Sequence, residues 1–144
     1  MEYKFIDKVS GVDTQFTNET IADFLFLHLD QFGDKKDYIL KCLDFVFAPD
    51  HGGFVLVSYE NGDITGAVIV NETGMEYYIP ENILVYIAVH RDQRGKGLGK
   101  TLLQKTMERA KGSIALHVEP DNPAKKLYEK LGFTNKYLEM RLQR

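Results

Sequence analysis

The stretch from Ile83 to Thr101 constrains the fold more than any other part of this 144-residue chain. It begins with an unbroken apolar run, Ile83 to Val89, which is typical of a strand buried on both faces of a parallel or mixed sheet. Three glycines follow at positions 95, 97 and 99, and a helix is predicted to begin near the last of them. Backbone N–H groups at such a turn point into one concavity, and the positive end of the helix dipole adds to them. The stretch therefore predicts an anion site, most simply for a phosphate group.

Length and composition predict a single domain, residues 1–144, with one sizeable core. Hydrophobic residues make up 44% of the chain and charged residues 27%, and no apolar run reaches the roughly 18 residues of a membrane span. The amino terminus lacks the apolar core of a secretory signal, and the single cysteine, Cys42, cannot form an internal disulfide. We therefore expect a cytoplasmic protein with no membrane partner.

Charge is distributed unevenly along the chain. The formal net charge of −3 argues against general binding to nucleic acid, which needs a basic face. Basic residues nevertheless gather between Arg91 and Lys111, whereas acidic residues are frequent between Asp13 and Asp50. These charges are either solvated helix faces or marks of two ligands, an anionic cofactor beside the glycine turn and a cationic substrate near the acidic half.

The other elements are predicted from apolar spacing and from turn residues. In order, they are a strand over 2–6, helices over 17–32 and 35–47, a hairpin of strands 53–59 and 64–70, a strand extension at 75–79, a helix that ends at Gly112, a strand over 114–118, a helix from Asn122 to Leu131, and one or two strands within 133–142. This order predicts an α/β fold in which helices flank both faces of one mixed sheet.

Two potentially reactive side chains are assigned to the core. His28 lies on the apolar stripe of the first predicted helix, and no second ligand stands at a recognisable spacing, so no metal site is predicted. Cys42 lies on the apolar stripe of the second predicted helix and is expected to be a small core residue.

The glycine spacing excludes two common phosphate-binding motifs. A Walker loop that ends in Gly99-Lys100-Thr101 would need its first glycine at Arg94. A dinucleotide fingerprint that begins at Gly95 would need its third glycine at Lys100. What stands there instead is Arg94-Gly95-Lys96-Gly97-Leu98-Gly99.

This pattern, Arg94-x-x-Gly97-x-Gly99 after an apolar strand, resembles the acetyl-coenzyme A (acetyl-CoA) motif of the GCN5-related N-acetyltransferase (GNAT) superfamily. The segment from His117 to Phe133 resembles the second cofactor segment of the same family. The resemblance implies the acyl-CoA N-acyltransferase fold, with a mixed sheet of six or seven strands and about four helices on its two faces. It also implies acetyl-CoA as co-substrate, without a metal.

The resemblance further implies roles for individual residues. Main-chain amides of the loop would hold the pyrophosphate, and the strands 83–89 and 114–118 would splay apart to admit the pantetheine arm. The implied cofactor-binding residues are Ile87, Ala88, Val89, Arg94, Gly95, Lys96, Gly97, Leu98, Gly99, Lys100, Asn122, Ala124 and Tyr128. Arg94, Lys96 and Lys100 could instead be plain surface charges, and Asn122 could be a helix cap.

Direct acetyl transfer needs an oxyanion donor, an acid for the leaving thiolate and an uncharged amine. By resemblance, the Val89 amide is the oxyanion donor and Tyr128 is the acid, although Tyr128 could also be a core aromatic. The glutamate that some family members carry six residues before the position of Val89 is replaced by Ile83. Glu81 is a candidate base if the strand extends past Pro80; a water relay or no dedicated base are the alternatives.

The sequence thus predicts an N-acetyltransferase that moves acetyl from acetyl-CoA to a primary amine, on a small molecule rather than a protein. The alternative is a CoA-binding regulatory or interaction module without transferase activity, which the missing glutamate favours. Twelve residues follow Gly132, so the final strands could be completed by a partner chain, as in a homodimer.

Overall fold

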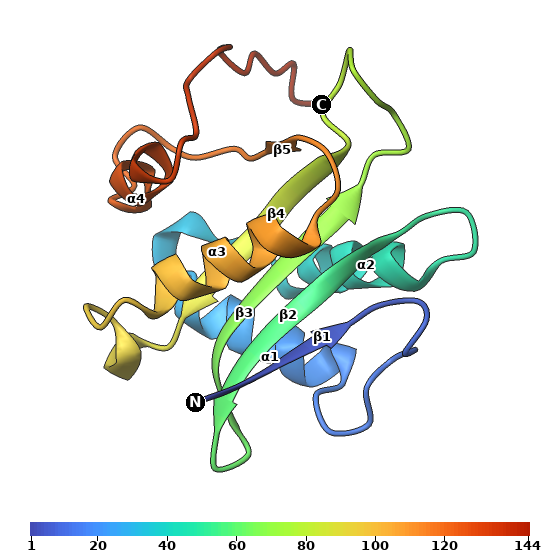
Figure 1. Ribbon diagram of the computed structural model, residues 1–144, viewed down its shortest axis with the longest axis vertical. Helices are drawn as coiled ribbons and strands as arrows, with labels where there is room; N and C mark the ends of the chain where they lie inside the picture. The colour runs from blue at the N-terminus through green and yellow to red at the C-terminus, as the bar shows by residue number, and fades with distance from the viewer.

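A five-stranded sheet forms the centre of the molecule, and helices cover both of its faces (Figure 1). The computed structural model describes all 144 residues. Its strands are β1 (Glu2–Ile6), β2 (Gly53–Glu60), β3 (Asp63–Glu72), β4 (Asn82–Val89) and β5 (Ile114–Ala115); its helices are α1 (Asn18–His28), α2 (Lys36–Phe47), α3 (Leu98–Arg109) and α4 (Ala124–Lys130), with short 3-10 helices η1 (Asp30–Phe32) and η2 (Arg91–Gln93).

The strands lie in the sheet in the order β1-β2-β3-β4-β5, and only β4 and β5 are parallel. The predicted hairpin is confirmed, because β2 and β3 pair around Asn61 and Gly62, which both have positive φ (51° and 81°). Such a turn matches the twist of the strands that it joins. The mixed sheet predicted from the sequence is therefore confirmed, although it has five strands rather than six or seven.

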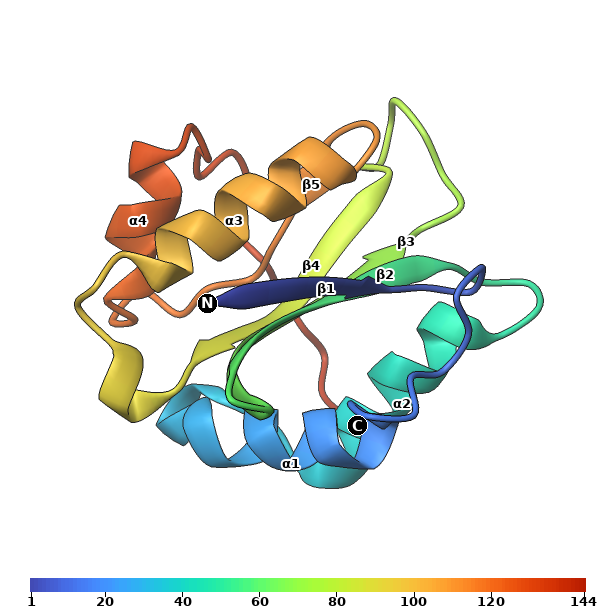
Figure 2. The same ribbon diagram turned by 60° about the horizontal axis from the view of Figure 1, so that its bottom comes forward.

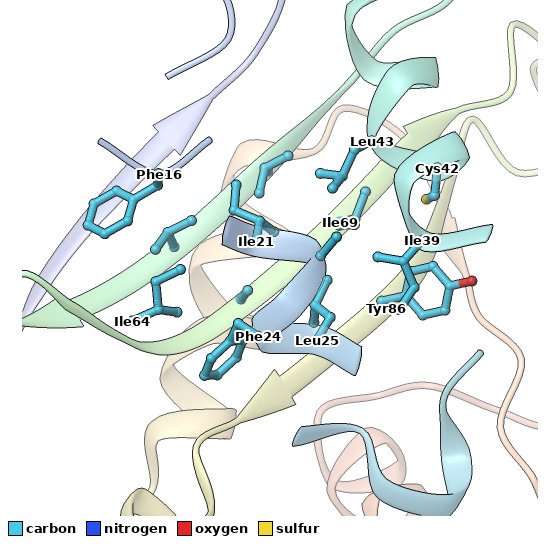
Figure 3. Packing of buried hydrophobic residues seen from close by; sticks show 14 of the residues in the cluster. Phe16, Ile21, Phe24, Leu25, Ile39, Cys42, Leu43, Ile64, Ile69 and Tyr86 are labelled. Carbon is cyan, nitrogen blue, oxygen red and sulfur yellow. The ribbon is translucent and has the colours of Figure 1, made fainter. Parts of the chain in front are cut away.

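Each face of the sheet buries its own apolar cluster. Helices α1 and α2 cover one face, whereas α3 and α4 cover the other (Figure 2). The cluster under α1 and α2 includes Leu25, Leu43, Ile69 and the predicted core residue Cys42 (Figure 3). The second cluster, under α3 and α4, includes Leu84, Leu102 and Tyr128. None of the helices is long and apolar enough to span a membrane.

A β-bulge divides β4 between these two clusters. Ile69 pairs with Tyr86, but the next residue of β3, Val70, pairs with Leu84, so Val85 is the extra residue. Leu84 consequently packs in the α3 and α4 cluster although Tyr86, two residues later, packs in the α1 and α2 cluster. A regular strand would place both residues on the same face.

Two predicted strands are wrong. Residues 75–79 form a loop, because Tyr77 adopts a left-handed conformation (φ 66°) and Pro80 follows it. Residues 133–142 form no strand, because β5, the last strand of the sheet, pairs with β4 over only two residues and offers no ladder to extend. Their apolar side chains, predicted to be available for packing, are instead exposed: Tyr137, Leu138, Met140 and Leu142.

The first helix is shorter than predicted and ends at His28 rather than at residue 32. Asp30 adopts a positive φ of 55°, which interrupts the helix before η1. The last carbonyls of α1 accept hydrogen bonds from two arginines far along the chain: Arg91 donates to Leu27 O (2.9 Å) and Arg94 donates to His28 O (2.6 Å). The helix end is therefore determined by tertiary contacts, which apolar spacing does not report.

Candidate active site

The end of β4 directs main-chain groups of Ile87 and Val89 toward a gap beside it. His90 N donates to Thr65 O of β3 (2.8 Å), so His90 and Thr65 form a hydrogen-bonded pair of the ladder between β4 and β3. In an antiparallel ladder, hydrogen-bonded and non-bonded pairs alternate. The backbone groups of Val89 and Ile87 therefore point away from β3, whereas those of Ala88 point toward it.

The neighbouring strand leaves that edge of β4 open. β5 pairs with Asn82 and Ile83 only, at the start of β4. The expected strand 114–118 is reduced to Ile114–Ala115, and beyond it the chain leaves the ladder. The predicted divergence of these two segments is thus present, and main-chain groups of Ile87 and Val89 face the gap that it opens.

The glycine turn after β4 forms the start of α3. Gly95 and Gly97 have φ values of 77° and 84°, in the left-handed region that favours glycine. Gly97 is the N-cap of α3, so the amides of Leu98, Gly99 and Lys100 have no partner within the helix. The Leu98 side chain packs in the core, and only its main chain faces outward. The turn therefore has the backbone conformation that an anion site needs, and binding of an anion there stays a prediction.

A cleft of about 610 Å³ lies between this turn and α4. Its walls carry three cationic side chains, from Arg94, Lys100 and Lys130, that suit a polyanionic ligand. Gly99 lies close to both α4 and β4, because a Cβ there would lie 3.6 Å from Leu127 and 3.8 Å from Val89. The full lining is Val89, Gln93, Arg94, Gly95, Gly97, Gly99, Lys100, Gln104, Leu127, Lys130 and Leu131.

Five lining residues were not predicted from the sequence. Gln104 stands four residues after Lys100, on the same face of α3. Leu127, Lys130 and Leu131 follow the three-and-four spacing of one face of α4. Both helical spacings can be recognised in the sequence, but the sequence does not show which face of α4 packs against the glycine turn. Gln93 carries no sequence signal that separates it from its neighbours.

Arg94 is occupied by protein contacts. Its guanidinium donates to the Asp30 carboxylate (2.9 Å), to His28 O (2.6 Å) and, through Nε, to Val89 O (3.2 Å). The two arginines beside Asp30 lower the pKa of its carboxyl group. Arg94 therefore joins the end of β4 to the end of α1, and its side chain lines the cleft from that position.

Tyr128 lies behind the cleft rather than on its wall. Its side chain is 7% exposed and belongs to the apolar cluster that Ile87 and Val89 contact. Burial raises the pKa of Tyr128 to about 12, and no protein group forms a hydrogen bond with its hydroxyl. The phenol is thus held in its protonated form.

The other predicted cofactor residues differ in placement. Asn122 is a cap, as its sequence context indicates, because its Oδ1 accepts from Ala124 N (3.0 Å) at the start of α4. Lys96 is exposed, and neither it nor Asn122 and Ala124 lines the cleft.

Glu81 lies at the opposite end of β4 from Val89. At about 3.3 Å per residue, the eight steps from Glu81 to Val89 span roughly 26 Å. Its carboxylate accepts hydrogen bonds from Ser113 N (2.7 Å) and Tyr77 N (3.1 Å), and these bonds lower its pKa. Pro80 and the turn before it prevent β4 from extending to Glu81. This geometry gives Glu81 a structural role and separates it from the glycine turn.

Residues 50–135 match the sequence model of the acetyltransferase (GNAT) domain. The chain belongs to this family. It is also 32% identical, over 101 residues, to the 5-NmdU N-acetyltransferase of Pseudomonas phage PaMx11, an alignment that covers 69% of this chain and 70% of that protein. The GNAT chain is therefore an acetyltransferase, and enzymes of this family use acetyl-CoA.

Solved structures show the same fold at low identity. A transcriptional regulator from Bacillus halodurans C-125 has a TM-score of 0.70 and 18% identity, over 99% of this chain and 100% of that chain. The aminoglycoside N-acetyltransferase AAC(6′)-Iy, solved in complex with CoA, has a TM-score of 0.69 and 15% identity, over 99% and 93% of the two chains. These likenesses confirm the acyl-CoA N-acyltransferase fold.

Proposed function

We propose that this GNAT acetyltransferase moves acetyl from acetyl-CoA directly to the primary amine of a small molecule. The observation that carries the proposal is the open edge of β4 ending at a glycine turn, which together fit an extended arm that ends in a diphosphate. Free N–H groups at the start of α3 suit the pyrophosphate, and Lys100 and Lys130 add positive charge beside it.

The pantetheine arm would lie along the open edge of β4 and pair with the backbone of Ile87, because the Val89 carbonyl already accepts from Arg94. The Val89 amide would donate to the thioester oxygen as negative charge develops there. Tyr128, kept protonated by burial, would give a proton to the leaving thiolate. Glu81 has no part in this proposal, and a water molecule would remove the proton of the amine.

We propose the acceptor from the PaMx11 relative, because it shares more sequence identity with this chain than the structural neighbours named above do. The PaMx11 protein is named for N-acetylation of 5-NmdU, so 5-NmdU is the first acceptor to test. Aminoglycosides are the second, because several structural neighbours are named for them at lower identity. The rival hypothesis, a CoA-binding module without activity, is less consistent with membership of an acetyltransferase family.

The test measures free thiol release from acetyl-CoA with 5-NmdU, kanamycin and spermidine. With an accepted amine, Tyr128→Phe should lower kcat about 100-fold or more and leave the KM for acetyl-CoA nearly unchanged. The melting temperature should stay close to that of the wild type, because the hydroxyl has no hydrogen bond to lose. Tyr78→Phe is the control, since Tyr78 is 78% exposed.

Two results would count against the proposal. Equal turnover in Tyr128→Phe would remove Tyr128 from the role of acid. Binding of CoA without amine-dependent thiol release by the wild-type protein would favour the regulatory module instead.

A further inference from the structure

His28 lies where the end of α1 meets the segment that leads into the glycine turn. Its side chain is buried, and its Nδ1 accepts a hydrogen bond from the main-chain amide of Arg91 (3.3 Å), the first residue of η2. Because Nδ1 accepts, the imidazole is neutral and carries its proton on Nε2. The ring also packs against the rings of Phe24 and His90, with centroids 4.6 and 4.2 Å away. A buried neutral histidine of α1 thus binds the backbone of η2.

The surroundings of His28 disfavour its charged form. Burial and the positive groups His90, Arg91 and Arg94 lower the pKa of His28 below its ordinary value. The Asp30 carboxylate acts in the opposite direction, but both of its oxygens already accept from the two arginines. Helix α2 and strand β3 also pack on α1, and no side chain of either bonds to His28. The imidazole is therefore neutral at neutral pH because of where the fold places it.

His90 differs from His28 although the two rings are in contact. Its Nδ1 also accepts from a main-chain amide, that of Asp92 (3.1 Å), but its side chain is 36% exposed. Water and the Asp92 carboxylate, 3.9 Å from that Nδ1, can therefore stabilise a charged His90. A charged His28 would instead place two donors, its own Nδ1–H and the amide of Arg91, against each other. Protonation of His28 thus breaks the contact between α1 and the backbone of η2.

The contact with His28 bears on the glycine turn because η2 leads directly into it. Only Arg94 separates η2 from Gly95, the first residue of the turn with a left-handed backbone. Arg91 and Arg94 also donate to carbonyls at the end of α1, but through long side chains. The bond to His28 Nδ1 is made by the main chain of Arg91 itself. His28 therefore fixes the backbone immediately before the amides that are proposed to bind the pyrophosphate, and a site for a charged group depends on such fixed positions.

We propose that neutral His28 is a positioning residue for the glycine turn, so that the affinity for CoA falls when His28 is protonated. This inference rests on the proposed function, because it needs CoA to bind at that turn. The sign follows from linkage: if CoA binds better to the protein with neutral His28, bound CoA lowers the pKa of His28 by the same factor. The affinity for CoA should therefore be constant at high pH and fall as the pH drops below about 6.5.

The variant His28→Asn tests the proposal because its Oδ1 takes the place of Nδ1 and accepts from the amide of Arg91 without titrating. Calorimetric titration of the full chain with CoA between pH 8 and pH 5.5, with near-UV circular dichroism to confirm folding at each pH, measures the affinity. We expect the wild type to lose about three- to tenfold more affinity over this range than His28→Asn, and the two to be similar at pH 8. His51→Asn is the matched control, because His51 is exposed and lies between α2 and β2; it should keep the wild-type profile. Titration of the CoA phosphates is common to all three proteins and cancels in the comparison.

An NMR titration of the His28 ring, with and without CoA, gives a second readout that a merely structural histidine would not move. Bound CoA should lower the pKa of His28; a higher pKa in the complex would mean that attraction to the phosphates dominates, and would overturn the inference. Equal pH profiles of CoA affinity in His28→Asn and wild type would also overturn it and leave the proposed function standing. Absence of CoA binding at pH 8 would overturn both, whereas the expected profile without acetyl transfer to any amine would support the inference and count against the proposed function alone.

Discussion

Replacing Gly97 by alanine, alongside a matched control, should distinguish two effects: the loss of folding stability from backbone strain in the glycine turn, and the loss of cofactor affinity. Gly97 has a φ of 84°, and a Cβ added there would meet no atom within 4 Å. The variant therefore has no steric clash, and its cost is that of holding an L-residue in a left-handed conformation, about 1–2 kcal/mol. For a chain of this size the melting temperature should fall by roughly 2–8 °C.

Gly62 provides a matched control because its φ is 81° and a Cβ there also meets no atom within 4 Å. It lies in the turn between β2 and β3, outside the cleft that Gly97 lines. Gly62→Ala should lose a similar amount of stability and keep its affinity for CoA. Only in Gly97→Ala does the new methyl group enter the space beside the unpartnered amides of α3.

The assay combines urea denaturation with calorimetric titration of CoA. At a CoA concentration 100 times Kd, bound CoA stabilises the wild type by about 2.7 kcal/mol. A tenfold weaker Kd in Gly97→Ala would reduce this to about 1.4 kcal/mol, whereas Gly62→Ala should retain the full value. Equal CoA affinity in the two variants would refute the assignment of this turn to the pyrophosphate.

Three further predictions concern residues around the site. Arg94→Ala and Asp30→Ala should weaken CoA binding by similar factors, measured by calorimetry, because both remove the ion pair that joins the glycine turn to α1. Weaker CoA binding in Arg94→Ala alone would instead make Arg94 a direct phosphate ligand. Burial and nearby positive groups lower the pKa of His28 below its ordinary value of 6.5, so its neutral form is favoured by folding. Stability should therefore fall as the pH drops below about 6.5, and melting curves of His28→Gln, with His117→Gln as control, should show a weaker fall. Burial raises the pKa of Cys42 to about 12, so iodoacetamide at pH 8 should modify it slowly in the folded protein and quickly in urea, and equal rates would contradict its burial.

The features that sequence reasoning predicted well depend on neighbours in the chain. The Asn61-Gly62 turn needs positive φ at adjacent positions, and the glycines at 95 and 97 need it for the same steric reason. Apolar spacing located α2 and α3 because each helix has one buried face. The glycine-turn side of the cleft was therefore predictable from one continuous stretch, whereas the side formed by α4 was not.

The features that it missed depend on contacts between distant segments. The end of α1 is determined by Arg91 and Arg94, which follow it by more than 60 residues. Strand propensity in residues 133–142 produced no strand, because a strand needs a ladder to join and β5 offers only two residues. Glu81 was considered as a base because strand alternation was extended past Pro80, whereas the chain turns there.

The bulge at Val85 explains how one strand can pack against both layers of helices. Without an extra residue, Leu84 and Tyr86 would lie on one face, and β4 could not pack Leu84 under α3 while it presents Tyr86 to Asp34. A bulge also increases the local twist of a strand, which favours divergence from a parallel neighbour such as β5. The bulge thus determines the face on which Tyr86 lies, and its added twist favours the open edge proposed for pantetheine.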